Sequence, residues 1–411
     1  MSEPLRLAYL TSAYARPSDT FVRSEVDRLR QRGVEVRTFS IRRPPVDAAC
    51  DPNVQQHQFD TDYILEAGFL RLLVTTVLGA IKSPRLFIAT MQLAWQTRAP
   101  GIRYLGLQCI YLLEAAYLAD HIQRAKLTHL HNHIGENSAT VAMLAGCLAN
   151  IPFSLTIHGP AIFSAPKRWA LGTKLDRAAF TVCISSFCRS QCMMFAKPST
   201  WQRLHVVRCA VGESFLDEPQ RSAEEMEPPL VVCVGRLCTE KGQRLLVDAV
   251  AQLATEGQCF RLLLVGDGPE REALESRIAQ QQLSSVVEIT GWQSSERIKA
   301  LLLQARVMIL PSFAEGLPIV LMEALALECP VISTSIAAIS ELVEHDHCGW
   351  LLPPGELVPL IASLREALNM PPDRLAALGR NGRLRVLEQH HPKRQVDQLL
   401  ELFTASDRNH K

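Results

Sequence analysis

Short apolar runs alternate with amphipathic stretches along most of the chain. In the first half, runs of strand length occupy residues 6–11, 34–41, 127–130, 152–157, 180–184 and 204–208. Such runs are expected for parallel strands that are covered on both faces. Amphipathic stretches between them, such as residues 20–32 before Gly33, predict helices. The alternation therefore predicts an α/β fold with a doubly wound sheet.

The same alternation restarts after residue 229. Strands are expected at residues 230–234, 260–265, 286–290, 306–310, 331–334 and 349–352, with helices between them. Residues 213–229 are acidic, hold three prolines and lack periodicity, which predicts an interdomain linker. We therefore expect two Rossmann-like domains, at residues 1–212 and 230–411, with C-terminal helices that pack back on the first domain. Ligands of such sheets bind outside the strand carboxyl ends, which predicts a site in a cleft between the two domains.

Residues 63–125 form an apolar helical segment that the sheet does not require. Its apolar runs are punctuated by Arg71, Lys82, Arg85 and Arg103. One interpretation is a set of core helices with a helical insertion. The other is a basic and apolar surface that rests on a membrane or meets a lipid tail. Peripheral membrane contact is therefore one expected partner interaction.

Net charge and hydropathy limit the cellular compartments and the kinds of partner that are expected for this protein. The formal net charge is +1, so no bulk basic field favours a nucleic acid partner. The first residues lack the long apolar core of a signal peptide, and the longest apolar runs are too short to span a bilayer. We expect a cytoplasmic protein, with attachment to the inner face of the cell membrane left open.

The 12 cysteines include no Cys-x-x-Cys pair. Cys183, Cys188 and Cys192 cluster in the sequence, but their spacing fits burial on a strand and a helix better than zinc binding. Free thiols in a reducing compartment are the expected state.

Asp60 and Asp62 have the spacing of the Asp-x-Asp pair that holds a metal and a nucleotide in some transferases. The match is three residues long, and it follows a loop rich in glutamine and histidine with no flanking strand. A solvated loop is the favoured interpretation, and no metal is expected.

The segment 309–334 contains the most informative candidate site. It predicts a buried strand end, a tight turn at Glu315, Gly316 and Leu317, a helix that begins at Pro318, and another strand. Free backbone N–H groups at the start of that helix would form an anion site. Glu323 would lie roughly 7–8 Å further along the helix axis. Two carboxylates so placed could serve one extended ligand.

Other strand-end loops add polar groups that packing does not require. Arg236 and Lys241 lie five residues apart in a loop bounded by glycines, which suits a diphosphate. Residues 266–269 form a tight turn before a helix, for which turn chemistry and ligand contact are both open. His158 follows a strand beside Gly159, where a backbone can approach a ligand. The loop at residues 12–19 lacks Gly-x-Gly-x-x-Gly and is a poor dinucleotide grip.

Three of these motifs together resemble those of retaining glycosyltransferase family 4, which has the GT-B fold. They are Gly-Arg-Leu-x-x-x-Lys-Gly at 235–242, Gly-Asp-Gly-Pro at 266–269, and Pro-Ser-x-x-Glu-Gly-Leu-Pro-x-x-x-x-Glu-Ala at 311–324. In the first half, residues 18–22 with Glu25, residues 131–133 and residues 156–160 are similar to a subgroup of colanic-acid and exopolysaccharide glycosyltransferases.

The resemblance implies transfer of a sugar from a nucleotide-diphosphate sugar, linked to UDP or GDP, to an acceptor hydroxyl with retained anomeric configuration. Arg236 and Lys241 would hold the diphosphate, with the N–H groups of Gly316 and Leu317 beside them. Glu315 would contact the donor sugar, and Glu323 the ribose. The remaining expected contacts are His158 near the reacting centre, Gly266 and Thr20. The resemblance implies no cofactor and no metal, and a glycan or lipid-linked acceptor.

Two departures limit the transfer of roles. Many relatives carry a glycine pair in the first strand–helix loop, but residues 13–18 contain none. The subgroup often has an acidic residue shortly after His-Gly-Pro, whereas this chain continues Ala161-Ile162-Phe163.

Two other functions remain open from the sequence. One is another GT-B nucleotide-sugar enzyme, such as an epimerase or a phosphorylase-like enzyme. The other is a catalytically silent scaffold that binds sugar nucleotides. The intact set of charged residues argues against the scaffold, and the apolar segment 63–125 favours a lipid-linked acceptor in polysaccharide assembly.

Overall fold

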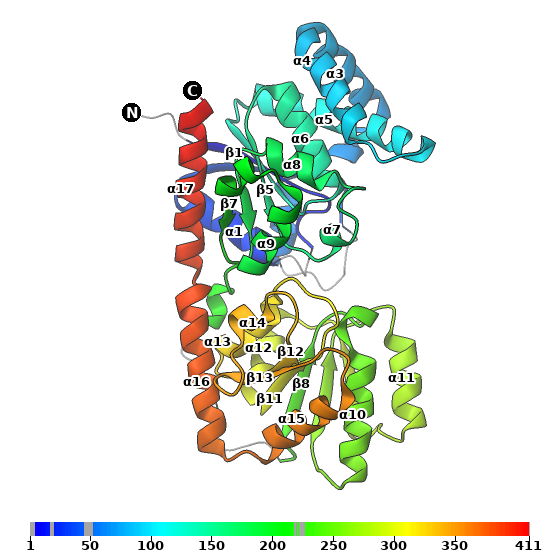
Figure 1. Cartoon of the computed structure of the whole chain (residues 1–411), viewed down its shortest axis with the longest axis vertical. Helices are drawn as coiled ribbons and strands as arrows, with labels where there is room; N and C mark the ends of the chain where they lie inside the picture. Colours follow the sequence, from blue (N-terminus) through cyan, green and yellow to red (C-terminus); the bar gives the residue numbers. More distant parts are fainter. Residues whose placement is uncertain are drawn as a thin grey trace. The chain divides into compact units, whose positions relative to one another are not determined.

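The chain folds into two compact α/β units (Figure 1). The computed structural model describes residues 5–16, 20–44, 52–217, 219, 221 and 227–410. Unit 1 comprises Met1–Arg208 and Lys393–Lys411, and unit 2 comprises Cys209–Pro392. Each unit is built around one parallel sheet, as the sequence predicts.

Unit 1 has a seven-stranded parallel sheet in the order β3-β2-β1-β4-β5-β6-β7. Its strands are β1 (Arg6–Thr11), β2 (Glu35–Ser40), β3 (Thr61–Tyr63), β4 (His129–His133), β5 (Phe153–Ile157), β6 (Thr181–Cys183) and β7 (Leu204–Val206). The central strands are buried along almost their whole length, which explains why they lack polar alternation.

One strand of unit 1 lies later in the chain than predicted. The sequence predicted a strand at residues 127–130, but β4 continues through His133. The histidines of β4 can be buried because Ser154 and Thr156 on the neighbouring β5 hydrogen-bond to them. Because these polar residues are buried with hydrogen-bond partners, the strand lacks the apolar pattern from which strands were predicted.

The helices of unit 1 cover the sheet and add the apolar segment. They are α1 (Thr20–Gln31), α2 (Pro52–Phe59), α3 (Phe69–Lys82), α4 (Pro84–Thr97), α5 (Ile102–Arg124), α6 (Asn137–Ala149), α7 (Ala161–Ser164), α8 (Leu171–Arg177), α9 (Ser186–Phe195) and α17 (Pro392–His410). The prediction of a loop before Asp60 with no flanking strand is therefore wrong. Helix α2 precedes Asp60, and Asp62 lies on the edge strand β3. No helix in the described part of the chain is both long and apolar enough to cross a membrane.

The expected domain boundaries need correction at two places. The first unit ends at Arg208 rather than residue 212, and the second ends at Pro392 rather than residue 411. The second correction arises because α17 inserts an apolar stripe, Val396, Leu399 and Phe403, into the core of unit 1. The prediction that C-terminal structure packs on the first domain thus holds for α17.

Unit 2 has a six-stranded parallel sheet in the order β10-β9-β8-β11-β12-β13. Its strands are β8 (Leu230–Val234), β9 (Arg261–Val265), β10 (Val287–Gly291), β11 (Val307–Leu310), β12 (Val331–Thr334) and β13 (Gly349–Leu352). Its helices are α10 (Gln243–Thr255), α11 (Arg271–Gln280), α12 (Ser295–Gln304), α13 (Ile319–Ala326), α14 (Ile339–Leu342), α15 (Leu357–Asn369) and α16 (Pro372–Gln389). The loops after β8, β9 and β11 meet at the carboxyl edge of this sheet.

Candidate active site

The loop after β8 runs closely against the turn after β9. The Gly235 N–H donates to the Val265 carbonyl over 3.0 Å, and the Leu237 N–H donates to the Asp267 carbonyl over 3.0 Å. A Cβ on Gly266 would lie 2.1 Å from the Gly235 carbonyl oxygen, so only glycine fits there. Gly266 thus has a packing role that explains its residue type, and its contact with a substrate stays a prediction.

The same loop is also tied to the segment after β11. A Cβ on Gly242 would lie 2.2 Å from the Pro311 carbonyl oxygen, and Gly242 has a positive φ of 69°. The Phe313 N–H donates to the Glu240 carbonyl over 2.7 Å. This packing places Lys241 beside the turn that carries Glu315.

Lys241 and Glu315 form an ion pair within this packing. The distance from Lys241 Nζ to Glu315 Oε1 is 2.5 Å, and the side chains are 21% and 10% exposed. Ser312 Oγ donates to the same Glu315 oxygen over 2.7 Å. Glu315 Oε2 has no hydrogen bond from the described residues, so one carboxylate oxygen remains for a ligand.

Arg236 differs from Lys241 in its surroundings. Its side chain is exposed, while its backbone carbonyl accepts from Gln243 Nε2 over 2.9 Å. Within the described parts of the chain, no acidic side chain pairs with its guanidinium. The loop therefore holds the backbone of Arg236 and leaves a cation for an anionic ligand.

The helix α13 begins one residue later than predicted. Pro318 is the residue before the first helical position, with φ −68° and ψ 122°. In the described structure, the N–H groups of Gly316 and Leu317 have no backbone acceptor, and no side chain caps the helix. These donors and the first N–H groups of α13 make a positive end beside Lys241.

Glu323 lies on α13 in a setting opposite to that of Glu315. Its side chain is only partly exposed, and it makes no hydrogen bond with the described residues. Burial raises the pKa of Glu323 to about 7. A carboxyl group that is desolvated and has no partner is well suited to bind hydroxyl groups of a ligand.

In unit 1, His158 lies at the end of a buried chain of polar groups. His133 Nδ1 lies 3.1 Å from His158 Nε2, and His133 Nε2 lies 3.0 Å from Glu25 Oε1. Glu25 also accepts from the Tyr9 hydroxyl over 2.8 Å and from Gln395 Nε2 over 3.0 Å. Glu25 and His133 are almost fully buried.

One proton of this hydrogen-bond network is fixed by its partner. A carboxylate can only accept, so His133 donates from Nε2 to Glu25, while its Nδ1 forms the contact with His158 Nε2. Burial and the neighbouring His133 lower the pKa of His158 well below its usual value. His158 is therefore neutral at pH 7, and its contact with His133 Nδ1 orients the ring.

The sequence predicted only part of this hydrogen-bond network. Glu25 and His133 appeared only as parts of motifs, without a role, and Tyr9 was assigned to a strand. Gln395 comes from α17, and nothing in the sequence signals its contact with Glu25. Thr20 is the first residue of α1, and its expected role stays a prediction. Ser18 and Asp19 of the same motif lie outside the described residues.

Among the described residues, two groups of side chains have donor atoms close enough for a metal ion. The first is Cys183, Cys188 and Cys192, and the second is Glu25, His131 and His133, each with donor atoms within 4.8 Å of one another. The cysteines are buried between β6 and α9, as their spacing predicted. Members of both groups hydrogen-bond to protein partners, so each group has a structural explanation.

Most of the expected site residues thus gather in unit 2. The structure brings together Arg236, Lys241, Glu315, Gly316 and Leu317 at one sheet edge, with Glu323 on the helix behind them. His158 and Thr20 belong to unit 1. A site shared between the units stays a prediction.

Comparison with known families agrees with the motifs in unit 2. The family model described as glycosyl transferases group 1 matches residues 214–385. All three motifs that suggested the resemblance lie inside this range.

Some of the curated relatives have names from polysaccharide biosynthesis. WcaL of Escherichia coli (strain K12), named for colanic acid biosynthesis, is 35% identical over 199 residues, 46% of this chain and 48% of that protein. The amylovoran biosynthesis glycosyltransferase AmsK of Erwinia amylovora is 32% identical over 169 residues, 40% of this chain and 41% of AmsK. The chain thus spans about half or less of the length of these curated relatives.

Solved structures match over nearly the whole chain. Sucrose-phosphate synthase of Thermosynechococcus elongatus superposes with a TM-score of 0.75 at 20% identity, covering 97% of this chain and 98% of that one. Anabaena Alr3699/HepE in complex with UDP-glucose gives a TM-score of 0.71 at 16% identity, covering 98% of this chain and 100% of that one. These similarities confirm the two-unit GT-B fold.

Proposed function

We propose that this chain, whose residues 214–385 match the family model of glycosyl transferases group 1, is a retaining glycosyltransferase of family 4. It would move a sugar from a UDP- or GDP-linked donor to an acceptor hydroxyl in the assembly of a cell-surface or exported polysaccharide. The observation that carries the proposal is the Lys241–Glu315 pair beside Arg236 and the N–H groups that precede α13, none of which has a partner among the described residues.

The cations would bind the diphosphate of the donor. Arg236 can grip two phosphate oxygens with its planar guanidinium, and Lys241 adds a point charge. The N–H groups of Gly316 and Leu317 lie in the same place and can donate to a third oxygen. Negative charge grows on the diphosphate as the sugar leaves, so these donors would stabilise the transition state more than the bound donor.

The two glutamates would contact opposite ends of the donor. Glu315 keeps one oxygen for hydroxyl groups of the sugar, while its other oxygen is fixed by Lys241 and Ser312. Glu323 would accept hydrogen bonds from the ribose hydroxyls, which would replace the water it lost on burial.

The proposed reaction takes place on one face of the sugar. The bond from the anomeric carbon to the diphosphate oxygen breaks, and the acceptor oxygen forms the new bond to that carbon. The acceptor proton passes to the departing phosphate oxygen. His158, neutral and oriented by His133, would contact the sugar or the acceptor at the reacting centre.

The proposal includes no metal ion, because Arg236 and Lys241 provide positive charge at the expected diphosphate site. Asp60 and Asp62 have other partners. Gln56 Nε2 donates to Asp60 Oδ2 over 2.9 Å, and burial together with the nearby Asp62 raises the pKa of Tyr117. The titles of the HepE structures name UDP and UDP-glucose as bound to that protein, so uridine nucleotides are the first donors to test.

We further propose that the acceptor is lipid-linked and that α3 and α4 rest on the cytosolic face of a membrane. One side of α3 is apolar and exposed along its whole length, with side chains from 39% to 73% exposed: Phe69, Leu70, Leu73, Val74, Val77, Leu78 and Ile81. Helix α4 adds Ile88, Met91 and Trp95. An apolar surface of this size on a water-facing helix hairpin needs a partner.

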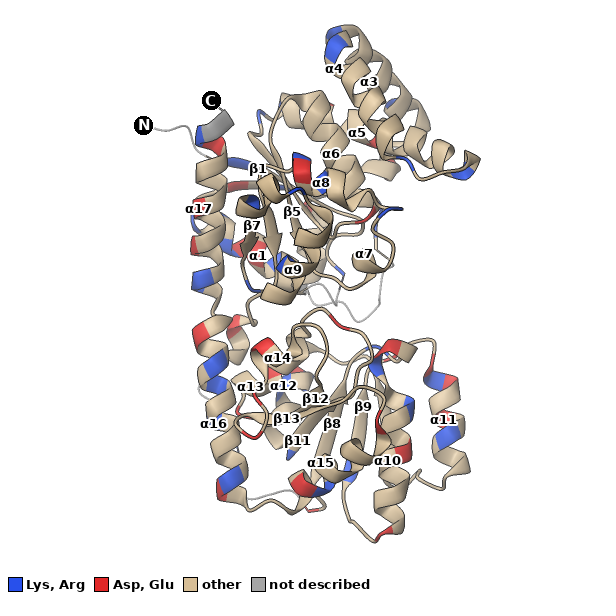
Figure 2. Cartoon of the chain, in the orientation of Figure 1, with Lys and Arg blue, Asp and Glu red and all other residues tan. Residues whose placement is uncertain are grey.

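The charge of this segment indicates an anionic partner. Residues 67–113 contain five basic residues and no acidic one: Arg71, Lys82, Arg85, Arg98 and Arg103. Figure 2 shows blue without red along α3 and α4. Each basic side chain near an anionic leaflet contributes about 1 kcal/mol of attraction. The apolar side of α3 and α4 would enter the headgroup region while these side chains remain at phosphate level.

A transfer assay with single substitutions tests the proposed site. Lys241→Ala and Glu315→Ala should each reduce sugar transfer by at least about a hundredfold, as expected for the loss of a transition-state contact. The matched control is Arg261→Ala, which removes one partner of the exposed Arg261–Glu288 pair, 3.0 Å long, on the same unit. Its activity should equal that of the unchanged protein.

A thermal-shift screen of nucleotide sugars identifies the donor. A ligand at 100 times its dissociation constant raises the free energy of unfolding of the protein by about 2.7 kcal/mol. Transfer should persist in EDTA. Full turnover by Lys241→Ala would contradict the proposed active site. Strict dependence on Mn²⁺ would instead favour Asp60 and Asp62, and conversion of the donor without any acceptor would favour an epimerase.

A further inference from the structure

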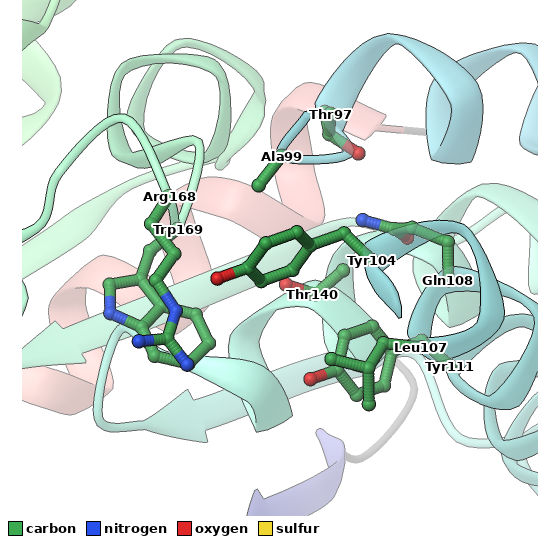
Figure 3. A pocket seen from close by; sticks show the side chains of 9 residues that line it. All are labelled: Thr97, Ala99, Tyr104, Leu107, Gln108, Tyr111, Thr140, Arg168 and Trp169. Carbon is green, nitrogen blue, oxygen red and sulfur yellow. The ribbon is translucent and has the colours of Figure 1, made fainter. Parts of the chain in front are cut away.

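A hollow lies in unit 1 where α4 and α5 meet the start of α6 and residues 165–170. Its volume is about 380 Å³ with its open mouth included. Nine residues line it: Thr97, Ala99, Tyr104, Leu107, Gln108, Tyr111, Thr140, Arg168 and Trp169. Figure 3 shows these side chains converging on one space from three separate segments of the chain.

Aromatic rings and one cation dominate the lining. The Arg168 guanidinium lies 4.7 Å from the centre of the Trp169 ring and 5.8 Å from that of Tyr104. Arg168 is exposed, and no acidic side chain in the described structure pairs with it. The hollow therefore offers ring faces and a guanidinium whose N–H donors are not used by the protein.

Gln108 supplies an independent sign that a ligand belongs here. Its side chain is 8% exposed, and its Oε1 has no hydrogen-bond partner. Figure 3 shows Gln108 at the edge of the hollow, with its amide nitrogen toward the space and its oxygen turned aside. A buried amide oxygen without a hydrogen bond loses its hydration with no compensation, so such groups are rare unless a ligand or a water completes them.

We propose that this hollow is a binding subsite for a pyranose ring of the acceptor saccharide. Aromatic faces pack on the C–H faces of a sugar ring, an amide oxygen accepts from a hydroxyl, and a guanidinium donates to ring substituents or to a neighbouring acidic group. The assignment to the acceptor rests on the proposed function. Thr97 and Ala99 lie at the end of the exposed helix α4, so the subsite adjoins the proposed membrane surface.

The first experiment measures saccharide binding directly. Saturation-transfer NMR with a panel of simple methyl pyranosides should detect binding to the full chain without any nucleotide. Trp169→Ala should weaken that binding at least about tenfold, as expected for loss of a stacking face. The matched control Trp201→Ala removes a partly exposed tryptophan of the same unit outside the hollow and should leave binding unchanged.

The second experiment replaces the unpaired amide. Gln108→Leu keeps the size of the side chain and removes the unpaired oxygen, so the melting temperature should stay equal or rise. In the transfer assay, the KM for the acceptor should rise about fivefold, with kcat and the donor KM unchanged.

Each outcome decides the proposal. No binding of any pyranoside, or equal binding by Trp169→Ala, overturns it. Competition by inorganic phosphate or a polyprenyl phosphate, with none by pyranosides, would assign Arg168 to a lipid phosphate and also overturn it. A thermal shift with nucleotide sugars is measured on the same preparation. Pyranoside binding without a nucleotide shift would refute the proposed function and leave the subsite standing.

Discussion

Glu315 and Glu323 lie eight residues apart in the sequence and have opposite surroundings. Glu315 is neutralised by Lys241 at 2.5 Å, whereas Glu323 is desolvated with no partner among the described residues. The sequence predicted two carboxylates with separate tasks, and the structure provides a physical basis for that separation. It did not predict the contact of Glu315 with Lys241, because residues 74 positions apart meet only through packing of two loops.

The raised pKa of Glu323 has a consequence for stability. Its folded-state value is about 7 against an ordinary value of 4.5, so the folded state binds the proton more tightly than the unfolded state. Stability is therefore lost as the pH rises from about 4.5 to about 7, and the penalty is complete above that range.

Glu323→Gln should remove this penalty. The free energy of unfolding should rise by up to about 3 kcal/mol at pH 8 and change little at pH 4.5. Urea unfolding at both pH values measures the difference. Glu272→Gln, at an exposed position on α11, is the control and should show no pH-dependent gain. An equal effect of Glu323→Gln at both pH values would contradict the assignment of the raised pKa.

At the scale of elements, the strands of unit 2 were predicted most accurately. The expected ranges 230–234, 331–334 and 349–352 coincide with β8, β12 and β13, since each is an apolar run with clear ends. Strand β4 was misplaced because its histidines have buried hydroxyl partners on β5. Those partners are set by register between strands, which a local pattern does not contain.

The segment 63–125 shows both features that its sequence left open. The second half of α5 is buried, as a core helix would be. Helices α3 and α4 instead expose their apolar sides. Periodicity identifies an apolar stripe, but it cannot say whether the stripe meets the protein core or another partner.

Two pairs of matched substitutions test the contact of α3 with a membrane. Leu70→Glu with Ile81→Glu changes two α3 side chains that are 73% and 71% exposed. Val358→Glu with Leu384→Glu changes equally apolar positions in unit 2 that are 76% and 65% exposed. Flotation with vesicles containing roughly one-third anionic phospholipid should recover the unchanged protein and the unit 2 variant. The α3 variant should bind at least about tenfold more weakly.

A different result would identify another partner for this surface. Absence of flotation at every anionic lipid content would contradict membrane contact. If gel filtration then showed an oligomer that Leu70→Glu with Ile81→Glu dissociates, a second copy of the chain would cover α3.

At the scale of the whole molecule, the sequence predicted two α/β units but not their true limits. The expected linker at 213–229 was chosen by composition, whereas the division at Arg208 follows from which contacts each segment makes. The return of α17 to unit 1 depends on three apolar side chains that would equally suit a helix on unit 2. Amphipathic helices encode a buried face without encoding its partner.

Phe403 allows the contribution of α17 to be measured. Its fully buried ring contacts Tyr9, His131 and Phe180 at ring-centre distances of 6.4, 5.3 and 5.4 Å. Phe403→Ala should therefore destabilise unit 1 by about 3–5 kcal/mol. Hydrogen exchange should accelerate in β1, β4 and α1 while β8 and β9 stay protected. The exposed Leu384→Ala in unit 2 should leave all of these strands protected, and acceleration in β8 by Phe403→Ala would refute the separate core.

The return of α17 also sets an order of events during synthesis. Domains usually fold as units from the N-terminus onwards as the ribosome releases them. Here residues 209–392 leave the ribosome before Val396, Leu399 and Phe403 do, although unit 1 began first. Unit 2 can thus complete its core while unit 1 still exposes the apolar surface that α17 will cover. A nascent chain of this protein therefore cannot complete the core of unit 1 until α17 has been made.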